Sequence, residues 1–160
     1  MPTITLHTWI DAPPERCFDL SRSIDLHQAS AARTGERAVA GVTAGLIGPA
    51  QEVTWRARHF GVWQTLTSRI TAYDRPRHFR DSQVRGAFAR FDHDHHFAPE
   101  GGGTRMTDVF DYAAPFGLLG RVAEWAFLTA YMRRFLAGRN AVIKATAESP
   151  AWTSYVAPAA

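Results

Sequence analysis

The chain of 160 residues has a single cysteine, Cys17, so it can form no internal disulfide, and this favours a reducing compartment. It has no run of about 18 apolar residues, the length that a membrane span requires. The first residues, Met-Pro-Thr-Ile-Thr, lack the basic and apolar regions of a signal peptide. The formal net charge is only +3 and the arginines are scattered, which argues against a nucleic-acid partner. We therefore expect a cytoplasmic protein that has no membrane span.

What the chain does contain is enough apolar material for one core. Hydrophobic residues make up 46% of the sequence and aromatic residues 12%. A chain of this length suits a single domain. Aromatic side chains often line small-molecule pockets, so the composition is compatible with a ligand site.

Sequence periodicity predicts a strand, two short helices, an antiparallel meander and a long helix. Ile4–Ile10 alternates as a strand, and Asp11-Ala-Pro-Pro ends it. Short helices follow at Glu15–Ser21 and at Ser23–Ser30, where Ser23 is a suitable N-cap. A short strand is expected at Glu36–Ala40. The meander is then predicted to contain the strands Glu52–Phe60, Val62–Ala72, His78–Arg85, Phe88–Phe97 and Thr104–Tyr112.

The C-terminal part is predicted to be one helix followed by a tail. Leu118–Ala147 repeats its apolar residues at helical spacing, and Trp125 belongs to that apolar side. Residues 149–160 are rich in proline and alanine, and either form a loose tail or dock their two aromatic residues on the body. The loop of residues 41–50 holds the apolar pair Leu46-Ile47, which reads either as a hydrophobic plug or as a lid over a pocket.

Strand Phe88–Phe97 places titratable side chains on its inner face. Alternation groups His93 and His95 with the apolar Phe91 and Phe97, whereas His96 points outward. The same rule places further polar residues of the sheet in the interior, namely His59, Gln64, Ser68, Asp81, Gln83 and Asp108. Because unpaired buried charges are costly, we expect the histidines to pair with Asp81 or Asp108.

Three interpretations of this polar cluster remain open. It is a structural network that satisfies itself, a polar patch that orients a ligand in an apolar cavity, or an acid–base pair in which His93 or His95 works with Asp108. His-x-His on a strand could also bind a metal. We do not expect a metal or another cofactor, because histidine-rich strands arise without one.

Several segments together resemble a known superfamily. They are Gly45-Leu-Ile-Gly, Glu52-Val-Thr-Trp-Arg-Ala-Arg-His-Phe-Gly61, Leu66-Thr-Ser-Arg-Ile70, Arg85-Gly-Ala-Phe88, His93-Asp-His-His-Phe97, Gly103-Thr-Arg-Met-Thr-Asp108, Pro115-Phe-Gly-Leu-Leu-Gly120 and Arg139-Asn140. The chain resembles the START/birch-allergen/polyketide-cyclase (SRPBCC) superfamily, and within it the bacterial "cell division inhibitor" or cyclase/dehydrase-like subgroup. The resemblance implies an α+β helix-grip fold at residues 1–148, in which a curved antiparallel sheet wraps around a long C-terminal helix. Residues 149–160 would be a tail.

The resemblance also implies a cavity between sheet and helix that holds a hydrophobic, aromatic or lipid-like small molecule. We predict its contacts to be Trp55, His59, Gln64, Leu66, Asp81, Gln83, Phe91, His93, His95, Met106, Asp108, Phe110 and Trp125. One alternative is a cyclase or dehydratase that uses a His–Asp pair. Another is a regulatory module whose loop 41–50 and aromatic tail form a partner surface.

Overall fold

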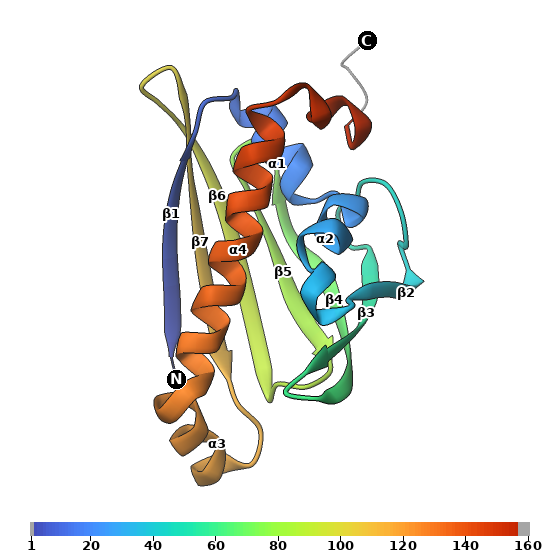
Figure 1. Ribbon diagram of the computed structural model, residues 1–160, viewed down its shortest axis with the longest axis vertical. Coiled ribbons are helices and arrows are strands. Elements are labelled where there is room, and N and C mark those ends of the chain that lie inside the picture. Colours follow the sequence, from blue (N-terminus) through green and yellow to red (C-terminus); the bar gives the residue numbers. More distant parts are fainter. Residues whose placement is uncertain (1, 157–160) are drawn as a thin grey trace.

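A curved antiparallel sheet is the main element of the computed structural model, which describes residues 2–156 (Figure 1). Its seven strands are ordered β1-β7-β6-β5-β4-β3-β2, so the first and last strands of the chain's sheet pair with each other. The strands are β1 (Thr3–Ile10), β2 (Arg37–Gly41), β3 (Glu52–His59), β4 (Val62–Asp74), β5 (His78–Arg85), β6 (Arg90–Glu100) and β7 (Gly103–Ala113). The register shifts twice in the pairing of β4 with β5, and such bulges increase local bend and twist.

Two short helices close one end of the sheet. Pro14 begins α1 (Pro14–Ser21), where a missing N–H costs no hydrogen bond. Ser23 caps α2 (Ile24–Ser30) by accepting the Leu26 N–H at 3.3 Å, as predicted. A 3-10 turn, η1 (Ala32–Thr34), leads into β2.

The C-terminal helical region lies across the concave face of the sheet. It consists of α3 (Gly117–Ala123), a π-helical turn η2 (Glu124–Leu128) and α4 (Thr129–Ala147). Figure 1 shows α4 crossing the sheet, with α3 at the end farthest from the described C-terminus. No helix of residues 2–156 is long and apolar enough to cross a membrane.

The π turn corrects the predicted face of Trp125. A continuous α-helix would place Trp125 above Met132, seven residues on, but Trp125 is 89% exposed whereas Met132 is buried. A π turn takes up one extra residue and so shifts the phase of everything before it. Accordingly Leu119 and Ala123, rather than Leu118 and Val122, border the cavity, although Leu119 is itself largely exposed.

The half of the interior nearest α1 is packed solid. Phe18 contacts Tyr73, Phe79 and Phe97 edge to face, with ring centroids 5.3 to 5.5 Å apart. Other buried members of this core are Ile10, Cys17, Leu20, Ile24, Leu26, Val53, Ile70, Met106, Ile143 and Ala147. This core supplies a rigid end against which the rest of the sheet and α4 are held.

The loop and the tail both contribute to this packed end. Ile47 of the loop is buried in the core, as a plug would be. In the tail, η3 (Pro150–Ser154) carries Trp152, which packs on the core under the guanidinium of Arg16 at 4.4 Å. Residues 157–160, the end of the predicted tail, lie outside the described part. Because these apolar groups are used for packing, they offer little surface to a partner.

The predicted helix-grip arrangement is confirmed. The meander, the two short helices and the long C-terminal helical region all lie where the sequence patterns predict them. The differences are small: the central strand begins at Arg90 rather than Phe88 and extends to Glu100, and the C-terminal region contains a π turn.

Candidate functional site

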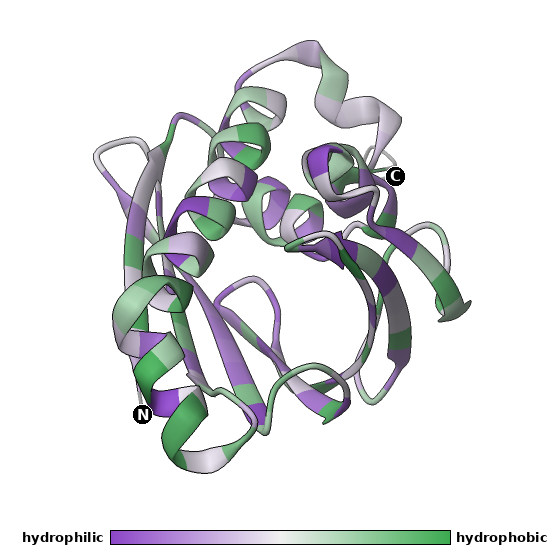
Figure 2. Ribbon diagram, turned by 60° about the horizontal axis from the view of Figure 1, so that its bottom comes forward, coloured by the Kyte–Doolittle hydropathy of each residue, from purple (hydrophilic) through white to green (hydrophobic). Residues whose placement is uncertain are grey.

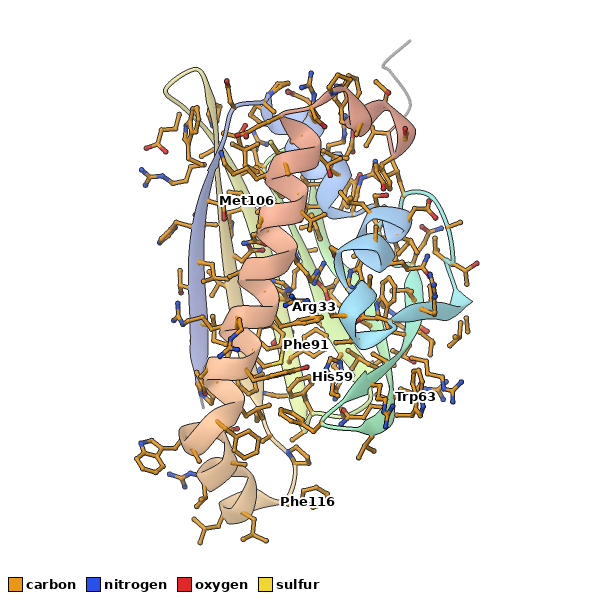
Figure 3. All side chains as sticks on the ribbon, in the orientation of Figure 1. Arg33, His59, Trp63, Phe91, Met106 and Phe116 are labelled. Carbon is orange, nitrogen blue, oxygen red and sulfur yellow. The ribbon has the colours of Figure 1, made fainter. Side chains whose placement is uncertain are left out.

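A cavity of about 460 Å³ lies between the sheet and α3–α4, in the half of the interior farther from the packed core. Figure 3 shows His59 and Phe91 beside α4 in the lower half of the molecule, whereas Met106 lies in the upper half, nearer the packed end. Most of the wall is apolar, with Trp55, Ala57, Leu66, Phe88, Phe91 and Phe110 from the sheet side and Leu128, Tyr131, Met132, Phe135 and Leu136 from the helix side. The volume is in the range of small-molecule sites.

Three phenylalanines, Phe60, Phe116 and Phe127, border the cavity at its outer end. Each is at least half exposed. Phe60 has φ of +51°, a left-handed conformation that costs a non-glycine residue about 1 to 2 kcal/mol. The conformation brings its ring to 4.5 Å from Tyr131 and 5.5 Å from Phe127, so β3–β4 and the helical region meet through aromatic contacts. Figure 2 shows this end of the molecule turned toward the viewer, with apolar residues concentrated in α3.

The floor of the cavity contains a buried histidine–aspartate network. His95 Nδ1 lies 2.7 Å from Asp108 Oδ1, and His95 Nε2 lies 3.2 Å from Asp81 Oδ1. His93 lies 3.3 Å from Asp108 and 3.8 Å from Asp81. The contacts of Asp108 Oδ1 with the two rings are poorly aligned for hydrogen bonding, and the shorter one, with His95, is best described as an ion pair. The other oxygen of Asp108 accepts a hydrogen bond of 2.5 Å from Asn140 of α4.

The pKa values of the two histidines are shifted in opposite directions. Burial disfavours the charged form of His95, but the carboxylates of Asp108 and Asp81 outweigh burial and raise its pKa to about 9. Burial, aided by the charge on His95, lowers the pKa of His93. Burial acts to raise the pKa of Asp108, yet its contacts with the two rings hold that pKa well below its usual range. At neutral pH the network therefore holds one cationic ring, His95, and one neutral ring, His93.

A second polar group faces the cavity from the opposite wall. His27 Nε2 and Glu36 Oε1 are 2.6 Å apart, and the His27 ring stacks on Trp55 with centroids 3.9 Å apart. Nearer the outer end, His59 Nδ1 forms a hydrogen bond of 2.6 Å with the hydroxyl of Tyr131. The first pair connects α2 to the segment before β2, and the second connects β3 to α4, so both hold the cavity wall together.

The structure gathers most of the predicted ligand contacts around this cavity. Those that line it are Trp55, His59, Gln64, Leu66, Asp81, Phe91, His93 and Phe110. Their role as ligand contacts stays a prediction. His59 is oriented by its hydrogen bond with Tyr131 rather than by the His93–His95 network.

Five predicted contacts do not line the cavity. Asp108 and His95 lie behind His93, where they support it, although His95 borders a smaller pocket of about 50 Å³. Gln83 is turned to the backbone of Phe88, to which it donates at 2.8 Å. Met106 is part of the packed core, and Trp125 is exposed for the reason given above. Strand alternation gives the face of a residue but not its height along the sheet, and this explains the misplacement of Gln83 and Met106.

The sequence reasoning missed polar groups from outside the central strands. His27 and Glu36 come from α2 and the segment before β2, and Tyr131 and Arg139 come from α4. Tyr131, Phe135 and Arg139 are spaced by four residues on α4, so a helical projection of Thr129–Ala147 places them on one face. For His27 and Glu36 no pattern in the sequence indicates their contact.

Among residues 2–156, two groups of side chains have ligand atoms close enough to hold a metal ion. They are Asp81, His93 and His95 in the interior, and His78, Asp94 and His96 on the outer face. In the inner group both ring nitrogens of His95 point at carboxylates, and the ring is protonated at neutral pH, so it offers no lone pair. In the outer group Asp94 is already bound by Arg80 through two hydrogen bonds. Neither arrangement is a prepared metal site.

Comparisons with known proteins agree with this architecture. A sequence profile of the family described as polyketide cyclase/dehydrase and lipid transport matches residues 1–148. A comparison with curated protein sequences gives no match.

Similar solved structures include TTHA0849 from Thermus thermophilus, with TM-score 0.71 and 20% identity over 91% of this chain and 99% of that one. The ginseng major latex-like protein 151 from Panax ginseng has TM-score 0.67 and 17% identity, over 92% and 98%. The protein Ms6760 from Mycobacterium smegmatis has TM-score 0.66 and 21% identity, over 89% and 88%. At these identities the likeness establishes the fold.

Proposed function

The chain belongs to the family of polyketide cyclase/dehydrase and lipid transport proteins, and we propose that it binds a hydrophobic or aromatic small molecule in the cavity between the sheet and α4. The predicted superfamily is thereby confirmed, whereas the predicted subgroup stays a prediction. The proposal is supported by one observation above all. Helix and sheet pack tightly at one end of the domain and are separated at the other by an apolar space of about 460 Å³.

The composition of the wall fits a ligand with a large apolar part. Aromatic rings from β3, β6, β7 and α4 surround the middle of the cavity. The polar lining residues are fewer and lie at the floor, at the His27–Glu36 pair and at His59, Gln64, Ser68 and Arg139. Burying apolar surface of a ligand contributes about 25 cal/mol per Å². A few polar groups at one end then fix the orientation of the ligand.

Filling the cavity with a side chain is the direct test. Ala57 of β3 is buried and lines the cavity, so Ala57→Phe places a ring in the ligand space without removing a packing contact. We expect wild-type protein to bind N-phenyl-1-naphthylamine, a neutral probe that fluoresces in apolar surroundings. Ala57→Phe should lower the affinity at least tenfold.

The matched control is Ala98→Phe, which adds the same ring to an exposed position of β6. It should bind the probe like the wild type, and circular dichroism should show that both variants are folded. Equal probe binding by all three proteins, or no binding by the wild type, would overturn the proposal. If the wild type binds the probe, native mass spectrometry of the purified protein can identify a molecule that co-purifies with it.

A second candidate function is an enzyme of the cyclase or dehydratase type. It is favoured by His93, a neutral imidazole that lines the cavity and is supported from behind by Asp108. Such a base could remove a proton next to a ketone, so that a carbon–carbon bond forms to a second carbonyl and water leaves. A tethered aryl 1,3-diketone would test this by mass spectrometry. Loss of one water with wild type, but not with a folded His93→Gln variant, would establish the activity.

A further inference from the structure

Arg139 of α4 lines the cavity, and the proposed binding of a hydrophobic molecule does not explain it. It is half-buried and borders both the main cavity and the smaller pocket beside His95, so it lies at the deep end of the ligand space. Its Nε atom is buried and has no hydrogen-bond partner. Within residues 2–156, no ion pair or hydrogen bond of the Arg139 side chain is found.

An arginine in this situation is unusual, because its guanidinium is always charged and carries five donors in a planar fork. Leaving a buried donor without an acceptor costs about as much as a lost hydrogen bond, and more for a charged group. The exposed arginines of the same helix carry no such cost. Arg139 is therefore costly to bury, and it lies at a position of α4 where its side chain reaches the cavity.

The acidic residues near Arg139 do not use its donors. Glu36 is in contact with His27 at 2.6 Å, and Asp81 with His95 at 3.2 Å, and neither carboxylate forms an ion pair with Arg139. Arg139 interacts with both carboxylates only through space: its charge lowers the pKa of Glu36 and of Asp81, and this effect is smaller than those of burial and of the histidine partners. The guanidinium therefore lies near two carboxylates that already have histidine partners, and its buried Nε donor is not used by either of them.

We propose that Arg139 binds a carboxylate, or an equivalent planar oxyanion such as an enolate, at the polar end of the ligand. This inference rests on the proposed function and adds the class of ligand to it. The spacing on α4 sets the orientation. Tyr131 and Phe135 precede Arg139 by two turns and one turn on the same side of the helix, so the apolar body lies along these rings toward the outer end at Phe116.

A matched pair of small aromatic probes separates this proposal from general apolar binding. The acid is 2-naphthylacetate, and the alcohol is 2-(2-naphthyl)ethanol, which has the same ring system and no charge. Isothermal titration at pH 7.5 should show that wild-type protein binds the acid more tightly than the alcohol. A charge-assisted hydrogen bond at this depth corresponds to a preference of roughly tenfold to a hundredfold.

Three variants locate the preference. Arg139→Met should lower the affinity for the acid by roughly tenfold to a hundredfold and change the affinity for the alcohol by less than about threefold. Arg139→Lys keeps the charge but not the fork, so its affinity for the acid should be intermediate. Arg134→Met removes the same charge from an exposed position of α4 and should bind both probes like the wild type.

The outcomes are distinct from those of the cavity-filling test. If wild type binds N-phenyl-1-naphthylamine but does not prefer the acid, the proposed function stands and the role of Arg139 is overturned. An acid preference that survives in Arg139→Met also overturns it. Should Arg139→Met fail to fold, the wild-type comparison and Arg139→Lys still decide, because neither depends on that variant.

Discussion

Strand β6 carries a histidine–aspartate cluster on each of its faces, and the two clusters differ in what surrounds them. On the outer face Asp94 accepts hydrogen bonds from Arg80 at 2.8 and 2.9 Å and lies 2.6 Å from His78. On the inner face Asp108 and His95, 2.7 Å apart, are buried between sheet and helix. Both clusters pair histidines with aspartates, but the outer one also contains Arg80 and is partly exposed, whereas the inner one is buried.

The comparison shows that every charged group of the inner cluster needs its protein partner, whereas a group of the outer cluster can lose a partner at little cost. Water can reach Asp94, whose side chain is 13% exposed and whose partner Arg80 is 43% exposed. Nothing replaces a missing partner of Asp108, whose side chain is only 2% exposed. The inner cluster therefore fixes the position of His93 on the cavity wall, and the outer cluster contributes mainly to pairing between β5 and β6.

The largest expected difference is in stability after loss of one carboxylate. Asp108→Asn leaves the His95 cation without its closest counter-charge, and we expect a loss of about 3 to 5 kcal/mol in the free energy of unfolding. Asp94→Asn should cost about 1 kcal/mol or less, as partly exposed ion pairs do. Urea unfolding of both variants measures the difference. Equal losses would mean that the two faces of β6 are equivalent.

The second largest expected effect is that the free energy of unfolding depends on pH through His95 of the inner cluster. The pKa of His95 is raised from 6.5 to about 9 on folding, so its contribution is complete below pH 6.5 and is lost as the pH rises toward 9. The expected loss is roughly 3 kcal/mol, at about 1.4 kcal/mol for each unit of pKa shift.

Two glutamine variants assign this pH dependence. His95→Gln should flatten the fall in unfolding free energy between pH 6.5 and 9. His96→Gln on the outer face should keep the fall, because burial lowers the pKa of His96 and confines its own titration to lower pH. A His95→Gln protein with an unchanged slope would contradict the assignment.

The smallest effect is the response to salt. A double-mutant cycle with Arg80→Met and Asp94→Asn should give a coupling of about 0.5 to 1 kcal/mol at low salt, and almost none at 0.5 M NaCl, where the Debye length is only about 4 Å. The cost of Asp108→Asn should be the same at both salt concentrations, since buried pairs are poorly screened. A salt-sensitive Asp108→Asn would show that water reaches the inner cluster.

Much of this arrangement could be predicted from residue alternation. The period of two in Phe91–Phe97 predicted which histidines lie inside, and the same rule placed Asp81 and Asp108 opposite them. Alternation is local and reliable because a one-residue slip would bury every polar side chain of the strand. The order of elements predicted the fold for the same reason.

The remaining errors come from features that no local pattern encodes. The π turn at Glu124–Leu128 changes the face of Trp125, and Thr129 at its end is hydrogen-bonded to Tyr112 of the distant strand β7. The pairing of His27 with Glu36 depends on how α2 packs against the sheet. Arg139 lay on a helix face that charge alone marks as exposed, and only the path of α4 over the sheet places it inside.

The size of the cavity has a consequence for the protein before any ligand arrives. A dry void of about 460 Å³ would cost on the order of 11 kcal/mol at about 24 cal/mol per Å³, as much as the whole stability of a typical domain. The same volume corresponds to roughly fifteen water molecules at about 30 Å³ each. Asp81, His93 and Arg139 would be the hydrogen-bond partners of such water, and a ligand has to replace those bonds when it enters the cavity.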